Sequence, residues 1–345
     1  MSPTSPLRIG IIGAGWPGER HTEGFTACDD AVVTAVADLE TTRREAFAAR
    51  YHVPKQYGAY HDLLADPEVD AVVIALPNHL HKPSTIAALE AGKHVFCEKP
   101  PAVNTAEARE MADTAAARGL VLGYATRRRY NPTTDRLAAR IAAGELGEIY
   151  HARAVWTRSW GVPQGVGGWF VDPLRAGGGA LIDIGIHVLD QAWFLMGNPK
   201  PVTISGSVFN KFPELTGTDD SAFALIRFDD GRSLHVEAAW VLAQPKDIQD
   251  VHIYGTAGGA RLDDDTLDYY NVGPEGARTL TPKFPRGQAA SFVGMAADFT
   301  HAIRTGGATR TSAEQGVLLM AMLEGIYRSG KEGREIAVEN VIRNS

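Results

Sequence analysis

The sequence has little cysteine, no long hydrophobic run and no excess of positive charge. Only Cys28 and Cys97 occur among its 345 residues, too few for a disulfide framework or a four-thiolate zinc site. We therefore expect both thiols to be reduced and buried. No stretch approaches the roughly 18 apolar residues of a membrane span, and no charged segment followed by an apolar one opens the chain. These absences predict a cytoplasmic protein that does not enter a membrane.

The charge balance and the length narrow the class further. Lys and Arg number 34 against 41 Asp and Glu, which gives a net charge of −7. This balance disfavours a general nucleic-acid binder or a protein that binds anionic membranes. At this length the chain is too long for one comfortable hydrophobic core, so we expect two domains.

Residues 7 to 127 alternate short apolar runs with helical segments. The runs are LRIGII, VVTAVAD, DAVVIAL, HVFCEK and LVLGYA. A helix expected over NTAEAREMADTAAARG begins at a capping box of Asn104 and Glu107 and ends at Gly119, and one over HLHKPSTIAALEAGK ends at Gly92. Strands that alternate with helices are typical of βαβ units. We therefore predict an α/β domain with a doubly wound parallel sheet over residues 1–127.

The pattern changes after RRRYNP. A helix expected over TTDRLAARIAAGELG precedes longer strand-like runs: EIYHARAVWTR, VTISGSVFN, SAFALIRF, SLHVEAAWV and VHIYG. Asp230 and Gly231 between two of these runs are a hairpin signal, and two amphipathic segments, 288–306 and 312–330, indicate closing helices. Residues 128–345 are therefore predicted to form an α+β domain with a largely antiparallel sheet.

A glycine-rich motif follows the first predicted strand and opens a helix. In IGIIGAGWPGERH, Gly13, Gly15 and Gly18 match G-x-G-x-x-G, with Trp16 and Pro17 between them. Such a turn leaves room for a pyrophosphate and presents it to the N–H groups of a helix N-terminus. The motif in this position predicts a dinucleotide-binding Rossmann domain.

An acidic residue ends the second predicted strand. Asp38 lies 20 residues beyond Gly18, where its carboxylate can bind the adenosine ribose hydroxyls. Followed by Leu39 and Glu40, it should repel a 2′-phosphate and favour NAD over NADP. Arg43 and Arg44 lie close enough in the sequence to weaken this preference.

Two further segments occupy the carboxyl ends of predicted strands, where open α/β sheets bind ligands. ALPNHLH supplies the candidates Leu76, Pro77, Asn78 and His81, and CEKP supplies Glu98, Lys99 and Pro100. FAD uses the same glycine motif, so the motif alone does not choose the chemistry. A lysine at this edge can reach the nicotinamide end of a bound cofactor.

The segment GGGALIDIGIHVLD places Asp183, His187 and Asp190 in an apolar setting. At i, i+4 and i+7 they would share one helical face. Burying an unpaired carboxylate or imidazole costs several kcal/mol, so the three belong to a buried hydrogen-bonded network, a metal site or a catalytic site. The nearby sequence has no Cys and no H-E-x-x-H, which argues against zinc; we expect no metal.

Together GAGWPGERH, PNHLH, AGKHVFCEKP and GGGALIDIGIHVLD resemble the glucose-fructose oxidoreductase, inositol dehydrogenase and rhizopine-catabolism oxidoreductase family, over nearly the whole length. In that family the lysine of E-K-P and the aspartate and histidine of D-x-x-x-H converge on the substrate carbon that faces the nicotinamide. By position these resemble Lys99, Asp183 and His187. The resemblance also implies an open antiparallel sheet in the second domain, commonly used for homodimers or homotetramers.

On this resemblance we assign hypothetical roles to the three residues. Oxidising a secondary alcohol requires a group that takes the hydroxyl proton and groups that hold the developing alkoxide. His187 would be the general base, Lys99 would polarise the oxygen, and Asp183 would bind the substrate and tune the imidazole. Asp190, one turn further, would support or pack the helix.

Two other segments are candidates for substrate recognition. The loop from Trp156 to Gly179 is rich in Trp and Gly, and precedes the expected catalytic helix as a lid or specificity loop would. Trp160 and Trp169 could stack on a sugar, and Arg158 or Arg175 could bind an anion; packing within the domain or across a subunit interface is the alternative. From RRRYNP we expect Arg129 and Tyr130 to line the cleft, and Arg127 and Arg128 to face solvent.

The leading hypothesis is an NAD-dependent oxidoreductase that transfers a hydride between nicotinamide and a secondary hydroxyl or ketone of a sugar, cyclitol or sugar derivative. One alternative is an NAD-dependent glycosidase that oxidises the sugar transiently, eliminates the aglycone and returns the hydride. Another is a non-catalytic NAD-binding regulatory protein, against which the joint presence of Lys99, Asp183 and His187 argues.

Overall fold

The structure is a computed structural model that describes residues 5–163, 168–271, 278–281 and 289–343. The chain divides into two compact units. The first takes in Met1–Arg127 and Ala289–Val317, and the second Arg128–Gln288 and Leu318–Ser345. Residues 289–317, which we expected in the second domain, thus group with the first unit.

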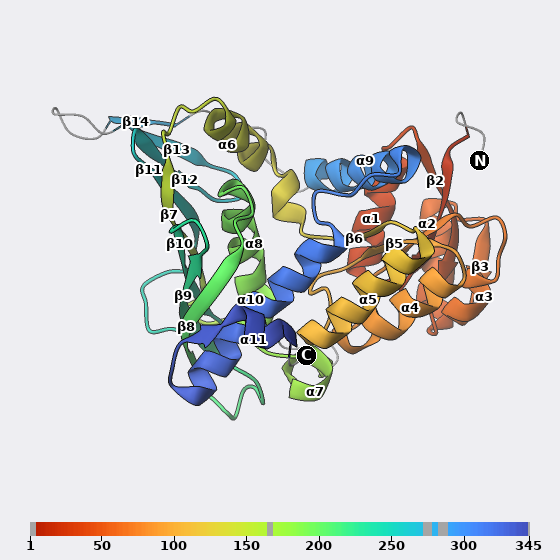
Figure 1. Cartoon of the computed structure of the whole chain (residues 1–345). Coiled ribbons are helices and arrows are strands. Elements are labelled where there is room, and N and C mark those ends of the chain that lie inside the picture. Colours follow the sequence, from red (N-terminus) through yellow and green to blue (C-terminus); the bar gives the residue numbers. More distant parts are fainter. Residues whose placement is uncertain (1–4, 164–167, 272–277, 282–288, 344–345) are drawn as a thin grey trace. The chain divides into compact units, whose positions relative to one another are not determined.

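A six-stranded parallel sheet forms the centre of the first unit (Figure 1). Its strand order is β3-β2-β1-β4-β5-β6, and every pair is parallel, which confirms the predicted doubly wound sheet. Its central strands consist almost entirely of buried apolar residues because both faces of the sheet are covered. The strands are β1 (Leu7–Ile12), β2 (Ala31–Ala37), β3 (Lys55–Tyr57), β4 (Ala71–Ile74), β5 (His94–Cys97) and β6 (Leu122–Tyr124).

The helices of the first unit begin and end at the signals that the sequence carries. α5 begins at Asn104, whose side chain accepts a hydrogen bond from the Glu107 N–H at 2.8 Å, and ends at Gly119 with φ of +64°. α1 packs against α9, and α4 packs against α5. The helices are α1 (Trp16–Thr26), α2 (Thr41–Tyr51), α3 (Tyr60–Leu64), α4 (His81–Glu90), α5 (Thr105–Arg118) and α9 (Ala289–Thr305), with the start of α10 (Ala313–Glu332).

A nine-stranded sheet forms the second unit. Its order is β14-β13-β12-β11-β7-β10-β9-β8-β15; β7 and β10 run parallel and the other described pairs are antiparallel. The hairpin at Gly231 (φ +88°) joins β9 to β10, as predicted. The strands are β7 (Ile149–Thr157), β8 (Pro201–Phe209), β9 (Ser221–Phe228), β10 (Ser233–Ala239), β11 (Ile248–Gly255), β12 (Gly258–Leu262), β13 (Leu267–Asn271), β14 (Arg278–Leu280) and β15 (Ile336–Ala337).

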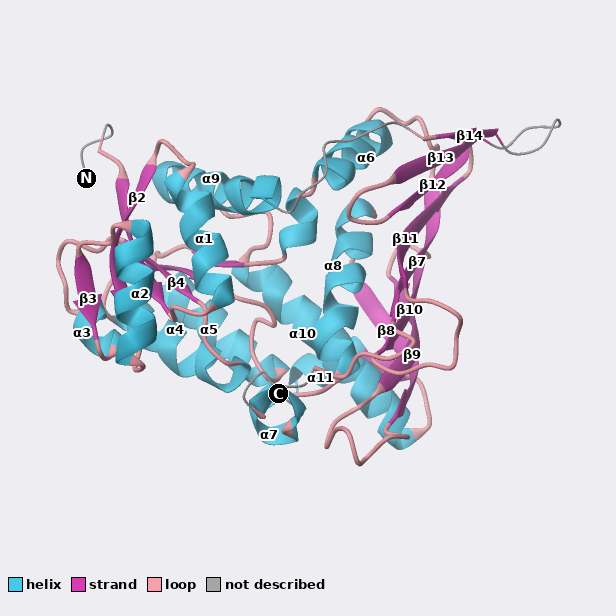
Figure 2. Ribbon diagram, turned by 180° about the vertical axis from the view of Figure 1, so that it is seen from behind, coloured by secondary structure: helices cyan, strands magenta, loops and turns pink. Residues whose placement is uncertain are grey.

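The two faces of this sheet differ in character. Figure 2 shows α6 (Pro132–Ala142), α8 (Ile186–Leu195) and α11 (Val338–Arg343) on one side of the sheet. Residues that face these helices are buried, as in the series Ala222, Ala224, Ile226 of β9, and the alternating residues Phe223, Leu225, Arg227 are half-buried or exposed. Among the described residues of this unit, no helix covers the second face, so the sheet is open on that side.

The segment GGGALIDIGIHVLD forms a π-helical turn followed by an α-helix. The turn η4 (Leu181–Gly185) leads directly into α8. It inserts a wider turn where a regular helix was predicted, and such turns are frequent at functional sites. In the described part of the chain, no helix is long and apolar enough to cross a membrane.

The interior of the second unit contains an ion pair between Arg129 and Asp190. Both side chains are almost completely buried, at 0% and 1% exposure, and the guanidinium binds both carboxylate oxygens at 2.5 to 3.0 Å. The guanidinium also lies over the rings of Trp193 and Phe194. The attraction between the two charges therefore offsets the hydration that each of them lost on burial.

The change Asp190→Asn should destabilise the second unit by about 3–5 kcal/mol, because it removes the carboxylate charge that the buried Arg129 guanidinium binds. Urea unfolding followed by circular dichroism measures this loss. Glu335→Gln is the matched control, since Glu335 pairs with Arg227 at 2.5 Å with both side chains about half exposed, and it should cost less than about 1 kcal/mol. Equal losses in the two variants would contradict the prediction.

Candidate functional site

The glycine motif forms the turn between β1 and α1, and each glycine has a different task. Gly13 has φ of +102°, a conformation that side chains rarely adopt. A Cβ on Gly18 would lie 2.1 Å from the Gly13 carbonyl oxygen, so only glycine lets the helix pack there. A Cβ on Gly15 would meet nothing closer than 3.8 Å, and no side chain caps the helix at this residue. The open N-terminus of α1 therefore fits a phosphate group.

Asp38 follows β2, beside the glycine turn. Its carboxylate accepts hydrogen bonds from the backbone N–H of Ala14 and of Glu40, both at 2.9 Å, and a bidentate pair from Arg43 at 3.0 and 2.9 Å. Burial by itself raises the pKa of Asp38, but these donors outweigh it and lower the pKa below its ordinary value. Because its pKa is lowered, Asp38 stays ionised, and a carboxylate beside the glycine turn fits a ribose diol. Arg43 is already bound to this carboxylate.

His81 lies at the start of α4 and is completely buried. Its Nδ1 is 2.7 Å from the Pro100 carbonyl oxygen, and its Nε2 is 2.8 Å from that of Leu76. Burial lowers its pKa, against the effect of the two carbonyls. Both ring nitrogens thus lie against backbone carbonyl oxygens, and the tautomer decides which nitrogen donates. The residue that we predicted to contact the cofactor therefore lies between the Leu76–Pro77 turn and the E-K-P segment. Asn78, in the turn η1 (Asn78–Leu80), is also buried.

Glu98 and Lys99 follow β5. Glu98 Oε1 lies 2.8 Å from Nε2 of His21, a residue of α1, and Oε2 accepts the backbone N–H of Lys99 at 3.1 Å. Burial raises the pKa of Glu98, but His21 and Lys99 reverse this effect, so that the pKa is lowered. Sequence reasoning missed His21, although its place one turn beyond Gly18, on the helix that the motif opens, was a usable signal.

The cysteines take no part in this arrangement. Both are free thiols; Cys97 is buried as predicted, whereas Cys28 is only half-buried. Burial raises the pKa of the Cys97 thiol far above its usual range, so it is not a nucleophile. Among the residues that the structure describes, no group of three or more His, Cys, Asp or Glu is placed to hold a metal ion.

Asp183 and His187 stand out in the second unit because they are half-buried while the residues around them are buried. All the remaining residues from Ala180 to Trp193 are buried. Asp183 Oδ2 accepts a hydrogen bond from the Trp240 indole N–H at 3.1 Å, and the His187 ring lies 5.6 Å from the ring of Trp156. The helix thus presents two reactive groups on one partly open side. Trp240, fully buried directly after β10, carried no signal in the sequence.

The three glycines before this helix allow close approach. A Cβ on Gly178 would lie 2.1 Å from the Tyr327 hydroxyl, and one on Gly179 would lie 2.0 Å from the Asp219 carbonyl oxygen. The Asp219 side chain accepts the N–H groups of Gly179 and Leu181, at 2.5 and 2.9 Å, and the Tyr327 hydroxyl at 2.8 Å. Burial raises the pKa of Asp219. This carboxyl group therefore holds the start of the π-helical turn.

The arginines of RRRYNP are placed differently from the prediction. Arg128, expected to face solvent, is 1% exposed; its guanidinium lies 4.8 Å from the Trp156 ring centroid and 3.3 Å from Asp264. Arg129, expected to line the cleft, is instead bound to Asp190 in the interior. Tyr130 is buried. In the short helix η2 (Arg127–Tyr130), successive residues point in different directions, and sequence spacing alone did not decide which arginine faces the site.

The Trp/Gly-rich loop packs partly on the core of the second unit. Trp160 is 64% exposed, and Trp169 is half-buried and contacts Phe170. Arg158 donates to the Gly161 carbonyl at 2.8 Å and lies over the Trp156 ring. The loop includes η3 (Trp169–Val171) and α7 (Pro173–Ala176), where Arg175 is exposed. Residues 164–167 of the loop lie outside the described residues.

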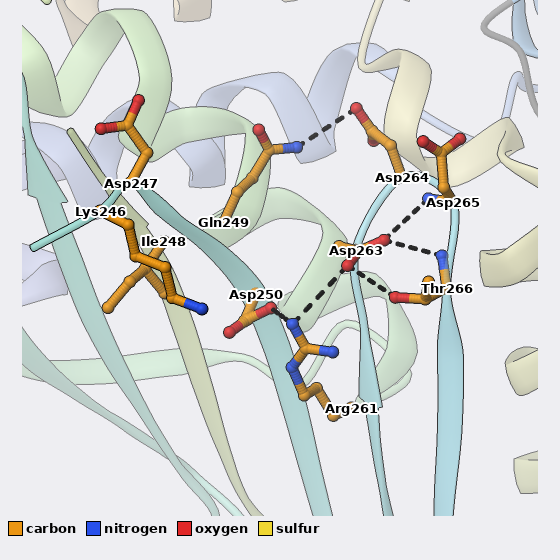
Figure 3. Close-up of a pocket in the computed structure, with 10 residues that line it drawn as sticks. All are labelled: Lys246, Asp247, Ile248, Gln249, Asp250, Arg261, Asp263, Asp264, Asp265 and Thr266. Carbon is orange, nitrogen blue, oxygen red and sulfur yellow. Dashed lines mark hydrogen bonds and ion pairs between the residues drawn. The ribbon is translucent and has the colours of Figure 1, made fainter. Parts of the chain in front are cut away.

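A cavity of about 490 Å³ lies where β11 meets the turn after β12 (Figure 3). Asp263 closes that turn by accepting from the N–H groups of Asp265 and Thr266, and Arg261 binds Asp250 at 2.5 Å. Asp264 accepts from Gln249 at 3.2 Å and pairs with Arg128. These carboxylates are thus neutralised within the protein, and Asp264 balances the charge of the arginine that faces Trp156.

Comparisons with known proteins agree with these features. The model of an oxidoreductase family with an NAD-binding Rossmann fold matches residues 7–126, and the model of the GFO/IDH/MocA C-terminal domain matches residues 134–261. The chain is 32% identical over 350 residues to the D-glucoside 3-dehydrogenase of Escherichia coli (strain K12), covering 96% of this chain and 98% of that protein.

Two further similar proteins are also named as dehydrogenases. The myo-inositol 2-dehydrogenase of Thermotoga maritima is 28% identical over 344 residues, 97% of this chain and 100% of that protein. Levoglucosan dehydrogenase in complex with NADH and levoglucosan matches the structure with a TM-score of 0.90 and 25% identity, over 97% of this chain and 100% of that one.

The chain therefore belongs to the Gfo/Idh/MocA family, as the resemblance indicated, and it is an oxidoreductase with an NAD-binding Rossmann fold. The relatives named above are dehydrogenases, which favours neither the glycosidase nor the regulatory alternative.

Gly18 and Gly15 of the motif should respond differently to substitution by alanine. Gly18→Ala forces the start of α1 away from Gly13 and should cost about 1–3 kcal/mol of stability, whereas Gly15→Ala should fold like the wild type because its methyl group meets nothing closer than 3.8 Å. Thermal unfolding without ligand separates the two. Comparable melting temperatures for both variants would refute this account of the turn.

Proposed function

We propose that this protein is an NAD-dependent dehydrogenase for a secondary hydroxyl of a sugar, cyclitol or glycoside. The observation that carries the proposal is the pair Asp183 and His187, held half-exposed on a buried helix by Asp219 and Trp240. Support comes from the relatives, which are named for a glucoside, an inositol and an anhydro-sugar. The reaction also runs in reverse, as reduction of the ketone.

In the proposed mechanism His187 takes the hydroxyl proton of the substrate as general base. Lys99 binds the same oxygen and stabilises the alkoxide that develops there. Asp183, oriented by the Trp240 indole, accepts a neighbouring substrate hydroxyl and keeps the imidazole in place. Bound NAD supplies the acceptor for the hydride. That Lys99 of the first unit joins Asp183 and His187 of the second is part of the proposal.

For the cofactor we propose binding on the N-terminus of α1, with Asp38 on the adenosine ribose and NAD preferred over NADP. Asp38 supports this preference because its carboxylate would repel a 2′-phosphate. Arg43 opposes it in part, since its guanidinium could bind such a phosphate once released from Asp38. Leu76, Pro77 and Asn78 would line the path towards the nicotinamide, and His81 would hold the turn that carries them.

For the substrate we propose that Trp156, between Arg128 and His187, lies beside the sugar. Exposed Trp160 and half-buried Trp169 of the loop are further candidates to cover it. We also propose that the domain at residues 1–127 binds the cofactor, that residues 128–345 carry substrate binding and self-association, and that the protein acts in the cytoplasm.

The test is NADH formation from a panel of sugars, cyclitols and glycosides, with product analysis and with NADP in parallel. We expect NADH from at least one member, and turnover that falls by roughly two orders of magnitude or more in Lys99→Ala and His187→Ala because proton transfer and alkoxide stabilisation are lost. Both variants should still bind NAD, which a fluorescence titration checks.

The control for these variants is Arg118→Ala, an exposed residue of α5, which should keep its turnover. Near wild-type turnover in both Lys99→Ala and His187→Ala would sink the mechanism. Release of an aglycone without net NADH would instead establish the glycosidase, and NAD binding without turnover of any compound would revive the regulatory reading.

We further propose that the open face of the nine-stranded sheet binds a second copy of the chain. The face presents aromatic side chains, Phe209, Phe223 and Tyr254, beside paired charges such as Arg153 and Glu237. A mixture of aromatic and balanced charged groups is typical of protein interfaces. A homodimer or homotetramer would cover this surface, and a monomer would leave it in water.

Light scattering on the eluting protein tests this assembly. The wild type should elute as a dimer or tetramer, and Leu225→Glu, on the open face of β9, should shift the mass towards the monomer because it introduces an unpaired charge into the interface. Leu174→Glu, on a residue that is 89% exposed in α7, is the matched control and should leave the mass unchanged. A wild-type monomer would refute the proposal.

A further inference from the structure

The E-K-P segment is fastened on both sides of Lys99 by buried histidines. Before Lys99, Glu98 binds His21 through Oε1 at 2.8 Å and the Lys99 backbone N–H through Oε2 at 3.1 Å. After it, the Pro100 carbonyl oxygen meets Nδ1 of His81 at 2.7 Å. The backbone is therefore held on each side of Lys99, by Glu98 before it and by His81 after it.

The His21 side chain is buried beside two aromatic rings. Its side chain is 1% exposed, and its ring is flanked edge-on by Phe96 at 5.7 Å and by Phe292 of α9 at 5.2 Å. These two phenylalanine rings carry no nitrogen or oxygen atom that could accept a hydrogen bond from the imidazole. Among the hydrogen bonds of the described residues, the contact with Glu98 is the one that this ring makes.

Glu98 is electrically coupled to both of its neighbours. The hydrogen bond from His21 of α1 and the neighbouring Lys99 of the same segment both lower the pKa of Glu98. The third titratable group beside the segment, His81, has its own pKa lowered by burial. If His21 were replaced by an apolar residue, the Glu98 charge would be left to stabilise the Lys99 ammonium alone.

We propose that His21 is a positioning residue for Lys99 and acts through Glu98. By binding one carboxylate oxygen it directs the other to the Lys99 backbone N–H, and it shares the carboxylate charge that would otherwise act on the Lys99 ammonium. The inference concerns how the E-K-P segment is set, and it rests on the proposed function only for its effect on turnover.

The experiment uses the whole protein and reads Lys99 without any substrate. Acetic anhydride labelling is followed by mass spectrometry as a function of pH, with exposed Lys200 as the internal reference. In His21→Leu the pH of half-labelling at Lys99 should rise by about one unit, because an unshared carboxylate favours the ammonium. In Glu98→Gln it should fall below that of His21→Leu. An unchanged value in both variants overturns the proposal.

Turnover supplies the second readout. In His21→Leu, kcat should fall roughly tenfold to a hundredfold because Lys99 is displaced, while the Kd for NAD stays within about twofold. His21→Gln retains an N–H donor towards Glu98 and should recover part of kcat. A loss of NAD binding in step with kcat, or no recovery in His21→Gln, would show a merely structural role and refute the proposal.

Tyr51→Phe is the matched control. It removes another hydrogen bond to the same helix, from the Tyr51 hydroxyl to Glu23 at 3.0 Å, and should change neither labelling nor kcat. If His21→Leu does not fold, His21→Gln and Glu98→Gln carry the labelling test by themselves. Failure of the wild type to oxidise any compound would overturn the proposed function, yet the labelling shift at Lys99 would still decide the role of His21.

Discussion

A charged side chain that leaves water must find a partner, and this requirement organises both units of the protein. In the first unit Asp38 is bound by Arg43 and two backbone N–H groups, and Glu98 by His21 and the Lys99 N–H. In the second, Asp219 binds the N–H groups at the start of the π-helical turn. Each carboxylate thereby fixes a backbone segment that carries a candidate site residue.

The same requirement separates supporting residues from working ones. Arg129 and Asp190 satisfy each other and are buried, so they build the interior of the second unit. Asp183 and His187, on the same helical segment as Asp190, stay half-exposed. The wider π-helical turn before α8 accompanies this difference, since it changes which residues of the segment share a face. The polar residues of this apolar helix thus fall into two groups: Asp190 is buried in an ion pair, and Asp183 and His187 are partly exposed.

Much of the fold follows from local sequence signals. The capping residue Asn104 and the left-handed Gly119 define α5, and the hairpin at Gly231 joins β9 to β10. Other elements left no such signal. The three-residue edge strand β3 is polar, and the strands β12 to β14 at one end of the second sheet are short, because such strands depend on their neighbours more than on their own composition.

The sequence by itself determined the parallel sheet, the glycine turn, Asp38 at the end of β2 and the spacing of Asp183 and His187, because these depend on residues close together in the chain. The tertiary structure alone decided which polar groups meet. It pairs His21 with Glu98, Trp240 with Asp183 and Asp219 with Gly179 over separations of 77, 57 and 40 residues. It also places Arg128 rather than Arg129 against Trp156. Contacts of this range arise from packing, and no local periodicity encodes them.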